Sequence, residues 1–205
     1  EKNKSIYREV LLQPMQQLVM ELQDSISEID PDIETRPLIN RAISNIYRDT
    51  RFSKDKSLFK DRMWLVFKRP SKEWKGQFPG FFFEIDPESY RYGMGYYSAS
   101  RSVMDTFRKA VLANPARFSR LVAFRRERGN KMLLQGEAYK RPIVSEYPVE
   151  LKEWFSLKTF YFCCDKKSDA ILYSSGLAIE LQKAFIQLGP LYRFLVGLVL
   201  TNDQK

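Results

Sequence analysis

Hydrophobic residues recur at intervals of three and four from Ile6 to Leu22, a spacing that predicts an amphipathic helix running to about residue 26. Pro14 lies inside this pattern and should kink the helix, because proline lacks the backbone N–H that the helix needs. The stretch from Glu21 to Thr35 then carries six acids and no base. We therefore expect a solvated acidic loop around Asp30-Pro31.

Short aromatic and β-branched runs bounded by prolines occupy residues 63–68 and 80–85 and predict two strands that pair antiparallel. Residues 131–135 and 157–163 have the composition of further strands. Between these pairs, Gly93 and Gly95 permit backbone angles that side chains forbid, which predicts a bend or bulge beside the sheet.

Helical spacing returns from Val103 to Val111, and Asn114-Pro115 is typical of a helix stop followed by a restart that continues to about residue 128. A last helix is predicted from residue 175 to 188, where Gly189-Pro190 should break it. Consecutive strands with helices in separate blocks indicate an α+β fold, with an antiparallel or mixed β-sheet packed against helices. We expect a single domain over residues 1–205 that lacks a short N-terminal part.

The composition excludes several kinds of catalytic and metal-binding site. The 205 residues contain no histidine, which excludes Ser-His-Asp and Cys-His nucleophile systems and histidine-ligated zinc. The two cysteines, Cys163 and Cys164, are adjacent and provide neither a disulfide framework nor a CxxC motif. The longest apolar run, residues 194–200, is too short to span a bilayer. We expect a cytoplasmic protein with no cofactor, no metal and no membrane contact.

The formal net charge is +9, and two windows contain the whole positive excess. Residues 48–75 hold ten bases and four acids, and residues 101–128 hold eight bases and two acids. Such concentrations attract anions. In the second window, Arg101, Asp105, Arg108 and Lys109 have the spacing of a solvated helix face with i,i+4 pairs, and we favour that interpretation there.

The first window contains the segment with the most distinctive chemistry, residues 47–60. Its candidate anion donors are Arg48, Arg51, Ser53 and Lys56, and its candidate orienting carboxylates are Asp49 and Asp55. A guanidinium held by a carboxylate, together with a hydroxyl and an ammonium group, suits a phosphate or another oxyanion. The alternative is an ion-pair network that locks a long loop to the sheet.

This segment resembles the signature R-x-x-R-D-x-R-F-x-x-x-K-x-x-Y of the bacterial family known as domain of unknown function 2461, which also occurs within longer fungal proteins. Arg48-Asp49, Arg51-Phe52 and Lys56 match the signature, whereas Asn45 and Phe59 depart from it. The resemblance covers essentially the whole chain. It implies no function, because none is established for the family.

The leading hypothesis is an uncharacterised binding module for an anionic or phosphate-bearing small molecule. We expect Arg48 or Arg51 to share one concave surface with Tyr97 or Arg101, because the predicted bend precedes the latter pair. The last candidates for the same pocket are Lys140 and Arg141.

Two other classes of function stay open. An enzyme could use Asp49 or Asp55 as a base and Lys56 as an acid or nucleophile. Weak, non-specific nucleic-acid binding could use the basic windows, with tyrosines as stacking platforms: Tyr90, Tyr92, Tyr96 and Tyr97. The sequence does not predict the oligomeric state.

Overall fold

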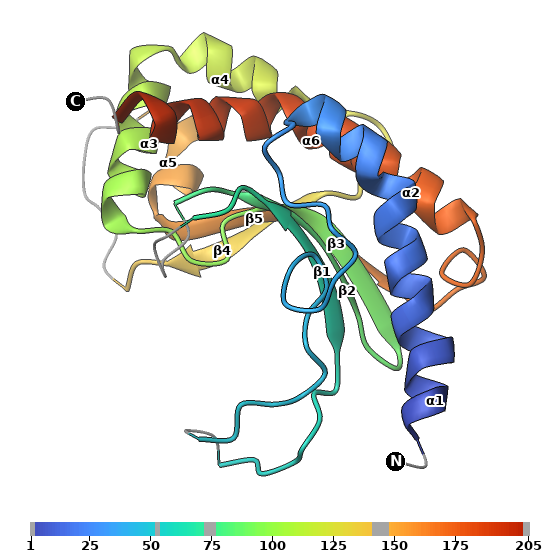
Figure 1. Cartoon of the computed structure of the whole chain (residues 1–205). Helices are drawn as coiled ribbons and strands as arrows, with labels where there is room; N and C mark the ends of the chain where they lie inside the picture. The colour runs from blue at the N-terminus through green and yellow to red at the C-terminus, as the bar shows by residue number, and fades with distance from the viewer. Residues whose placement is uncertain (1–2, 52–53, 72–76, 141–147, 203–205) are drawn as a thin grey trace.

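A computed structural model describes residues 3–51, 54–71, 77–140 and 148–202 of the chain. The described strands form one antiparallel sheet in the order β1-β2-β3-β5-β4 (Figure 1). Their bounds are β1 Met63–Lys68, β2 Gly80–Ile85, β3 Ser89–Gly95, β4 Leu133–Ala138 and β5 Leu157–Lys167. The predicted α+β class is confirmed, and the described sheet is antiparallel throughout.

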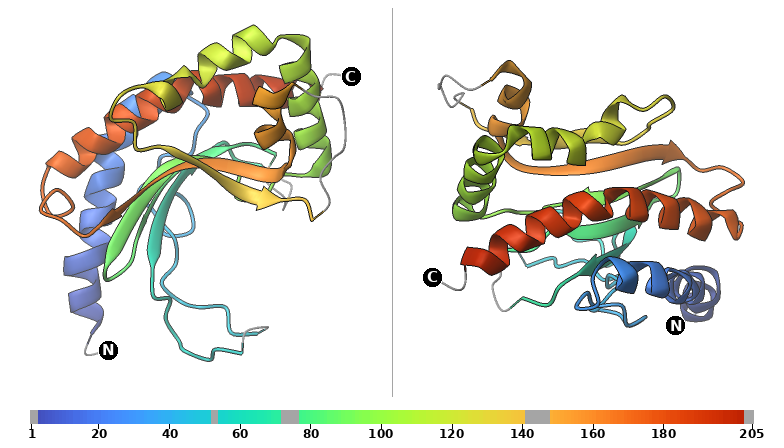
Figure 2. Two further views of the ribbon diagram at one scale, coloured as in Figure 1. Left: turned by 180° about the vertical axis from the view of Figure 1, so that it is seen from behind. Right: turned by 90° about the horizontal axis from the view of Figure 1, so that it is seen from above.

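The longer helices lie on one face of the curved sheet, and no described helix covers the opposite, concave face (Figure 2). The helical bounds are α1 Lys4–Tyr7, η1 Arg8–Leu12, α2 Gln13–Ile29, α3 Arg101–Ala113, α4 Pro115–Leu121, η2 Ala123–Arg126, α5 Val149–Phe155 and α6 Gly176–Asn202. The short helix α5 was not predicted from the sequence.

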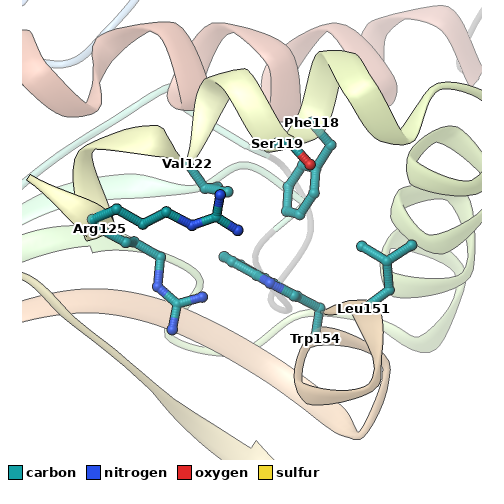
Figure 3. Close-up of a pocket in the computed structure, with 7 residues that line it drawn as sticks. Phe118, Ser119, Val122, Arg125, Leu151 and Trp154 are labelled. Carbon is teal, nitrogen blue, oxygen red and sulfur yellow. The ribbon is translucent and has the colours of Figure 1, made fainter. Parts of the chain in front are cut away.

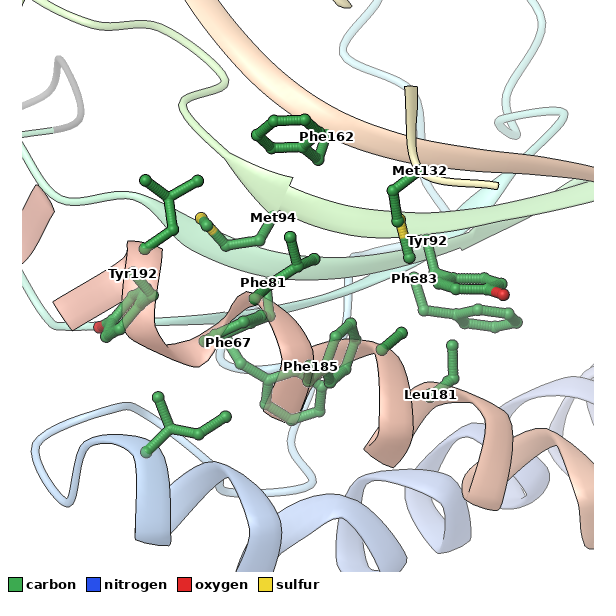
Figure 4. Close-up of a cluster of buried hydrophobic side chains, with 14 of the residues drawn as sticks. Phe67, Phe81, Phe83, Tyr92, Met94, Met132, Phe162, Leu181, Phe185 and Tyr192 are labelled. Carbon is green, nitrogen blue, oxygen red and sulfur yellow. The ribbon is translucent and has the colours of Figure 1, made fainter. Parts of the chain in front are cut away.

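The core lies between the sheet and α6. Strand side chains that alternate inward are fully buried, whereas their neighbours on the concave face, such as Trp64 and Phe82, are half-buried. Phe81 packs against Phe185 and Tyr192 of α6, with ring centroids 5.1 and 4.9 Å away (Figure 4). The period-two pattern of the strands therefore places one face against the helices.

The first helix forms as predicted, but Pro14 does not end or sharply interrupt it. A π-helical turn, η1, immediately precedes α2, and Pro14 is the second residue of α2. A wider turn of this kind accommodates the missing N–H of proline and the bulk of its ring. The helical run therefore continues to Ile29.

The predicted acidic loop is wrong in two respects. Glu21, Asp24 and Glu28 lie on α2 rather than in a loop, and Asp30 is buried rather than solvated. Arg69, at the end of β1, lies 2.6 Å from Asp30 and provides the opposite charge that allows burial. A counterion more than thirty residues away is invisible to a local pattern.

The predicted bend at Gly93 and Gly95 is also wrong, because both glycines lie within β3, between β2 and β5. These glycines allow β5 to approach β3 closely. A Cβ atom on Gly93 would lie 1.8 Å from the carbonyl oxygen of Phe162, so β5 passes where a side chain would be.

The predicted break at Gly189-Pro190 is wrong as well, since α6 continues through both residues. Gly189 packs against Ile29 at the end of α2, where an added Cβ would lie 3.4 Å from that side chain. By length and composition α6 could also cross a membrane, but half of its most apolar stretch is buried inside the protein. We describe it as a core helix.

Candidate functional site

The predicted motif lies on a hairpin-like projection, residues 45–62, which we call the arm. Isolated bridges pair Ile43 with Leu65 and Tyr47 with Phe59, so the chain runs antiparallel to itself beyond the start of β1. Figure 1 shows the arm extending away from the sheet. Lys60 secures its root by donating to the carbonyl of Asn45 at 2.6 Å.

Two ion pairs join the motif residues of the arm. Arg48 Nη1 lies 3.0 Å from Asp55 Oδ2, and Arg51 Nη2 lies 2.7 Å from Asp49 Oδ2. Only Arg48 is appreciably shielded, with 27% of its side chain exposed against 77% for Arg51. These two pairs connect parts of the arm to one another. Arg62, at the base of the arm, lies 3.2 Å from Glu84 of β2, so an ion pair holds the base of the arm to the sheet.

The remaining motif donors are Lys56 and Ser53. Lys56 donates to the carbonyl of Thr50 at 2.8 Å and is exposed, and Ser53 lies outside the described residues. The hydrogen bond from Arg51 lowers the pKa of Asp49 to about 2, and the backbone hydrogen bond from Ser57 is the main cause of a lowered pKa at Asp55. Both carboxylates are therefore poor general bases near neutral pH.

The other predicted site residues lie elsewhere. Tyr97 is fully exposed, and the Arg101 side chain is 87% exposed and 3.6 Å from Asp105. Lys140 is exposed beyond the end of β4, and Arg141 lies outside the described residues. Among the described residues, no hydrogen bond or ion pair joins Tyr97, Arg101 and Lys140 to one another.

The two groups leave the sheet at opposite ends. The arm precedes Met63, whereas the chain that leads to Arg101 follows Gly95, which is level with Lys68 at the other end of β1. Six residues of strand separate these ends by about 17 Å. This topology does not support the predicted concave surface shared by the two groups.

The predicted tyrosine platform is not formed either. Tyr90, Tyr92 and Tyr96 are buried, at most 5% exposed, and only Tyr97 faces solvent. Three of these four rings belong to the core, as aromatic residues in strands usually do.

A cavity of about 320 Å³ lies instead between α4, η2 and α5 (Figure 3). It is lined by Phe118, Ser119, Val122, Arg125, Arg126, Leu151 and Trp154. Asn114 begins α4 by accepting a hydrogen bond from the N–H of Arg117 at 2.9 Å. Phe118 and Trp154 pack edge to face with centroids 4.8 Å apart, which fixes the apolar wall.

Two guanidinium groups give the cavity its charge. Arg125 Nη2 lies 3.0 Å from Glu153 Oε2, and its guanidinium is 5.4 Å from the Trp154 ring centroid. Arg126 is exposed and forms no ion pair with any residue that the structure describes. Arg125 is thus held in place, while the charge of Arg126 is available to an anion.

The sequence contained part of this signal. Both arginines lie in the second basic window, which we interpreted as a solvated helix face. That interpretation is confirmed for Arg101 and Asp105. It is wrong for Arg108, which is buried and donates to the carbonyl of Leu157 at 2.8 Å. Trp154 lies on the unpredicted helix α5, nearly thirty residues further along the chain. In the described residues, no group of three or more acidic or cysteine side chains is placed to hold a metal ion.

Comparison with known proteins gives a family and no function. Neither a curated protein nor a solved structure matches the chain. The family model described as "Conserved hypothetical protein (DUF2461)" matches residues 1–194. The match spans nearly the whole chain, from the first helix into the second half of α6. The chain therefore belongs to the DUF2461 family.

Proposed function

We propose that this protein is a binding module for a small anionic molecule, and that its binding site is the cavity formed by α4, η2 and α5. The observation that carries the proposal is the pairing of Arg125 and Arg126 with an aromatic wall in one cavity. Ligand sites combine apolar walls with a few convergent polar groups, and in this cavity two arginines and one serine lie beside four apolar residues.

The geometry favours a ligand with two parts. An oxyanion would bind the Arg126 guanidinium and the hydroxyl of Ser119, while a flat or apolar part would lie against Phe118 and Trp154. The volume of about 320 Å³ is at the lower end for small-molecule sites, which suits a compact ligand. A phosphate or carboxylate on an aromatic ring has this form, and we infer a cytoplasmic metabolite of that class.

Binding of phenyl phosphate, measured by isothermal titration calorimetry, tests the proposal. We expect Arg125→Ala/Arg126→Ala to weaken binding by at least about tenfold, because charge-assisted hydrogen bonds are lost. The matched control is Arg120→Ala/Arg128→Ala, which removes the same charge from exposed positions that do not line the cavity.

The control should bind phenyl phosphate as the wild type does. Equal weakening in both double variants would show that net charge alone attracts the anion, and would contradict a site in the cavity. Inorganic phosphate should bind more weakly than phenyl phosphate if the aromatic wall takes part.

A further inference from the structure

The arm presents apolar surface to solvent. Tyr47 is 62% exposed, Leu58 is 69% exposed and Phe59 is 52% exposed, and the rings of Tyr47 and Phe59 pack together with centroids 5.6 Å apart. Exposed apolar side chains gathered on a projection, with charged residues around them, are typical of an interaction surface.

The charge of the arm defines what can cover it. Residues 48–62 contain six bases and three acids. Each acid already pairs with an arginine of the arm: Asp49 with Arg51, Asp55 with Arg48 and Asp61 with Arg62. The lysines supply the surplus, and Lys54 and Lys56 lie exposed near the tip. A partner surface must therefore be acidic.

The same chain carries such a surface. Glu21, Asp24 and Glu28 are spaced three and four residues apart on α2 and are all exposed, which makes one acidic stripe. None of the three forms an ion pair with a described residue, and residues 21–29 contain no base. Met20, beside the stripe, is 49% exposed and offers apolar contact. The stripe therefore matches the arm in two ways: its charge is opposite, and an exposed apolar side chain lies beside it.

The arm does not lie on its own stripe. Figures 1 and 2 show the arm leaving the sheet on the side away from the second half of α2, which lies near α6. Two complementary surfaces that do not meet within one chain can meet reciprocally between two copies related by a twofold axis. Each contact then forms twice.

We propose that the protein is a homodimer in which the arm of each copy docks on the acidic stripe of the other. Lys54 and Lys56 face Glu21, Asp24 and Glu28 of the second copy, and the exposed apolar residues of the arm pack beside Met20. The residues that resemble the family signature then shape a docking element, and their ion pairs fix the arm.

Charge reversal tests this dimer by sedimentation equilibrium of the full chain. Wild-type protein should be a dimer that dissociates as salt rises from about 0.05 to about 0.5 M, because exposed charges are screened. Lys54→Glu/Lys56→Glu and Glu21→Lys/Glu28→Lys should each weaken the dimer by at least about tenfold. An equimolar mixture of the two variants should form a heterodimer, since each supplies the complement of the other.

The matched control is Lys109→Glu/Lys131→Glu, which makes the same charge change at exposed positions outside the arm. It should leave dimerisation unchanged, and circular dichroism should show every variant folded. The proposal would be overturned if the wild type is a monomer, or if the control variant dimerises as weakly as the arm variant. It would also be overturned if the mixture of the two variants stays monomeric. Arm-dependent binding of single-stranded DNA by a monomer would assign the arm to nucleic acid instead. These outcomes do not depend on ligand binding in the cavity.

Discussion

Arg69 binds Asp30 through two charged hydrogen bonds, from Nε to Oδ2 at 2.6 Å and from Nη2 to Oδ1 at 2.8 Å. The hydroxyl of Tyr192 donates to the same carboxylate at 2.9 Å. Asp30 follows α2, Arg69 follows β1 and Tyr192 lies in α6, so a single carboxylate joins three elements of the fold. This cluster connects the helical layer to the end of the sheet.

Arg69→Met should lower the free energy of unfolding by about 3 kcal/mol, because it leaves a buried carboxylate without its counterion. Only 5% of the Asp30 side chain is exposed. Arg51→Met is the matched control, since its pair with Asp49 is exposed, and it should leave the stability unchanged within error. Equal urea midpoints for the two variants would contradict the importance of the cluster.

Stability should also depend on pH through Asp30. Burial raises the pKa of Asp30, but hydrogen bonds from Arg69, from the N–H of Asp32 and from Tyr192 together lower it below the ordinary value. The folded state therefore binds this proton less readily than the unfolded state. The resulting stabilisation is present above the unfolded pKa of about 4 and is lost as the pH falls through the lower folded-state pKa.

The wild-type urea midpoint should consequently fall more steeply with decreasing pH than that of Asp30→Asn, which has no charge to lose. Other acids titrate in both proteins and so cancel in the comparison. If the urea midpoints of the two proteins fall equally as the pH drops below about 5, then protonation of Asp30 does not contribute to the pH dependence of stability.

Gly93→Ala should destabilise the sheet by about 2 kcal/mol or more, because the new methyl group would overlap the backbone of β5 and force the strands apart. Gly197→Ala is the opposite case. No atom lies within 4 Å of an added Cβ there, and alanine favours the helix by up to about 1 kcal/mol. Thermal unfolding of the two variants should therefore shift in opposite directions.

Both cysteines should resist modification in the folded protein. Cys163 and Cys164 are at most 1% exposed, and burial raises the pKa of the Cys163 thiol well above its usual range. Ellman's reagent should react with neither thiol in buffer and with both in urea. Rapid reaction without denaturant would mean that β5 opens readily.

Local patterns predicted the first two strands well. The strands at residues 63–68 and 80–85 have the predicted bounds and pairing, because alternating burial leaves a direct trace in sequence. The cap at Asn114 was also predicted, since capping involves neighbouring residues only. Features that one short segment determines by itself can be predicted from the sequence alone.

The features that failed depend on distant partners. The sequence around Asp30 predicts a solvated loop, because the ion pair with Arg69 that allows its burial is formed only in the folded structure. Gly93 was predicted to lie in a bend, because the close approach of β5 that requires a glycine there is not visible in the local sequence. The candidate cavity needs Arg125 and Trp154, which approach each other only when α5 packs beneath α4. The arm was recognised as unusual by composition, but its place at the far end of the sheet from Arg101 depends on strand direction.

A crystal structure of the protein soaked with phenyl phosphate tests the proposed function most directly. The account predicts density for the ring against Trp154 and Phe118, with the phosphate within hydrogen-bond distance of Arg126 and Ser119. Density on the arm beside Arg48 and Lys56, with an empty cavity, would contradict it.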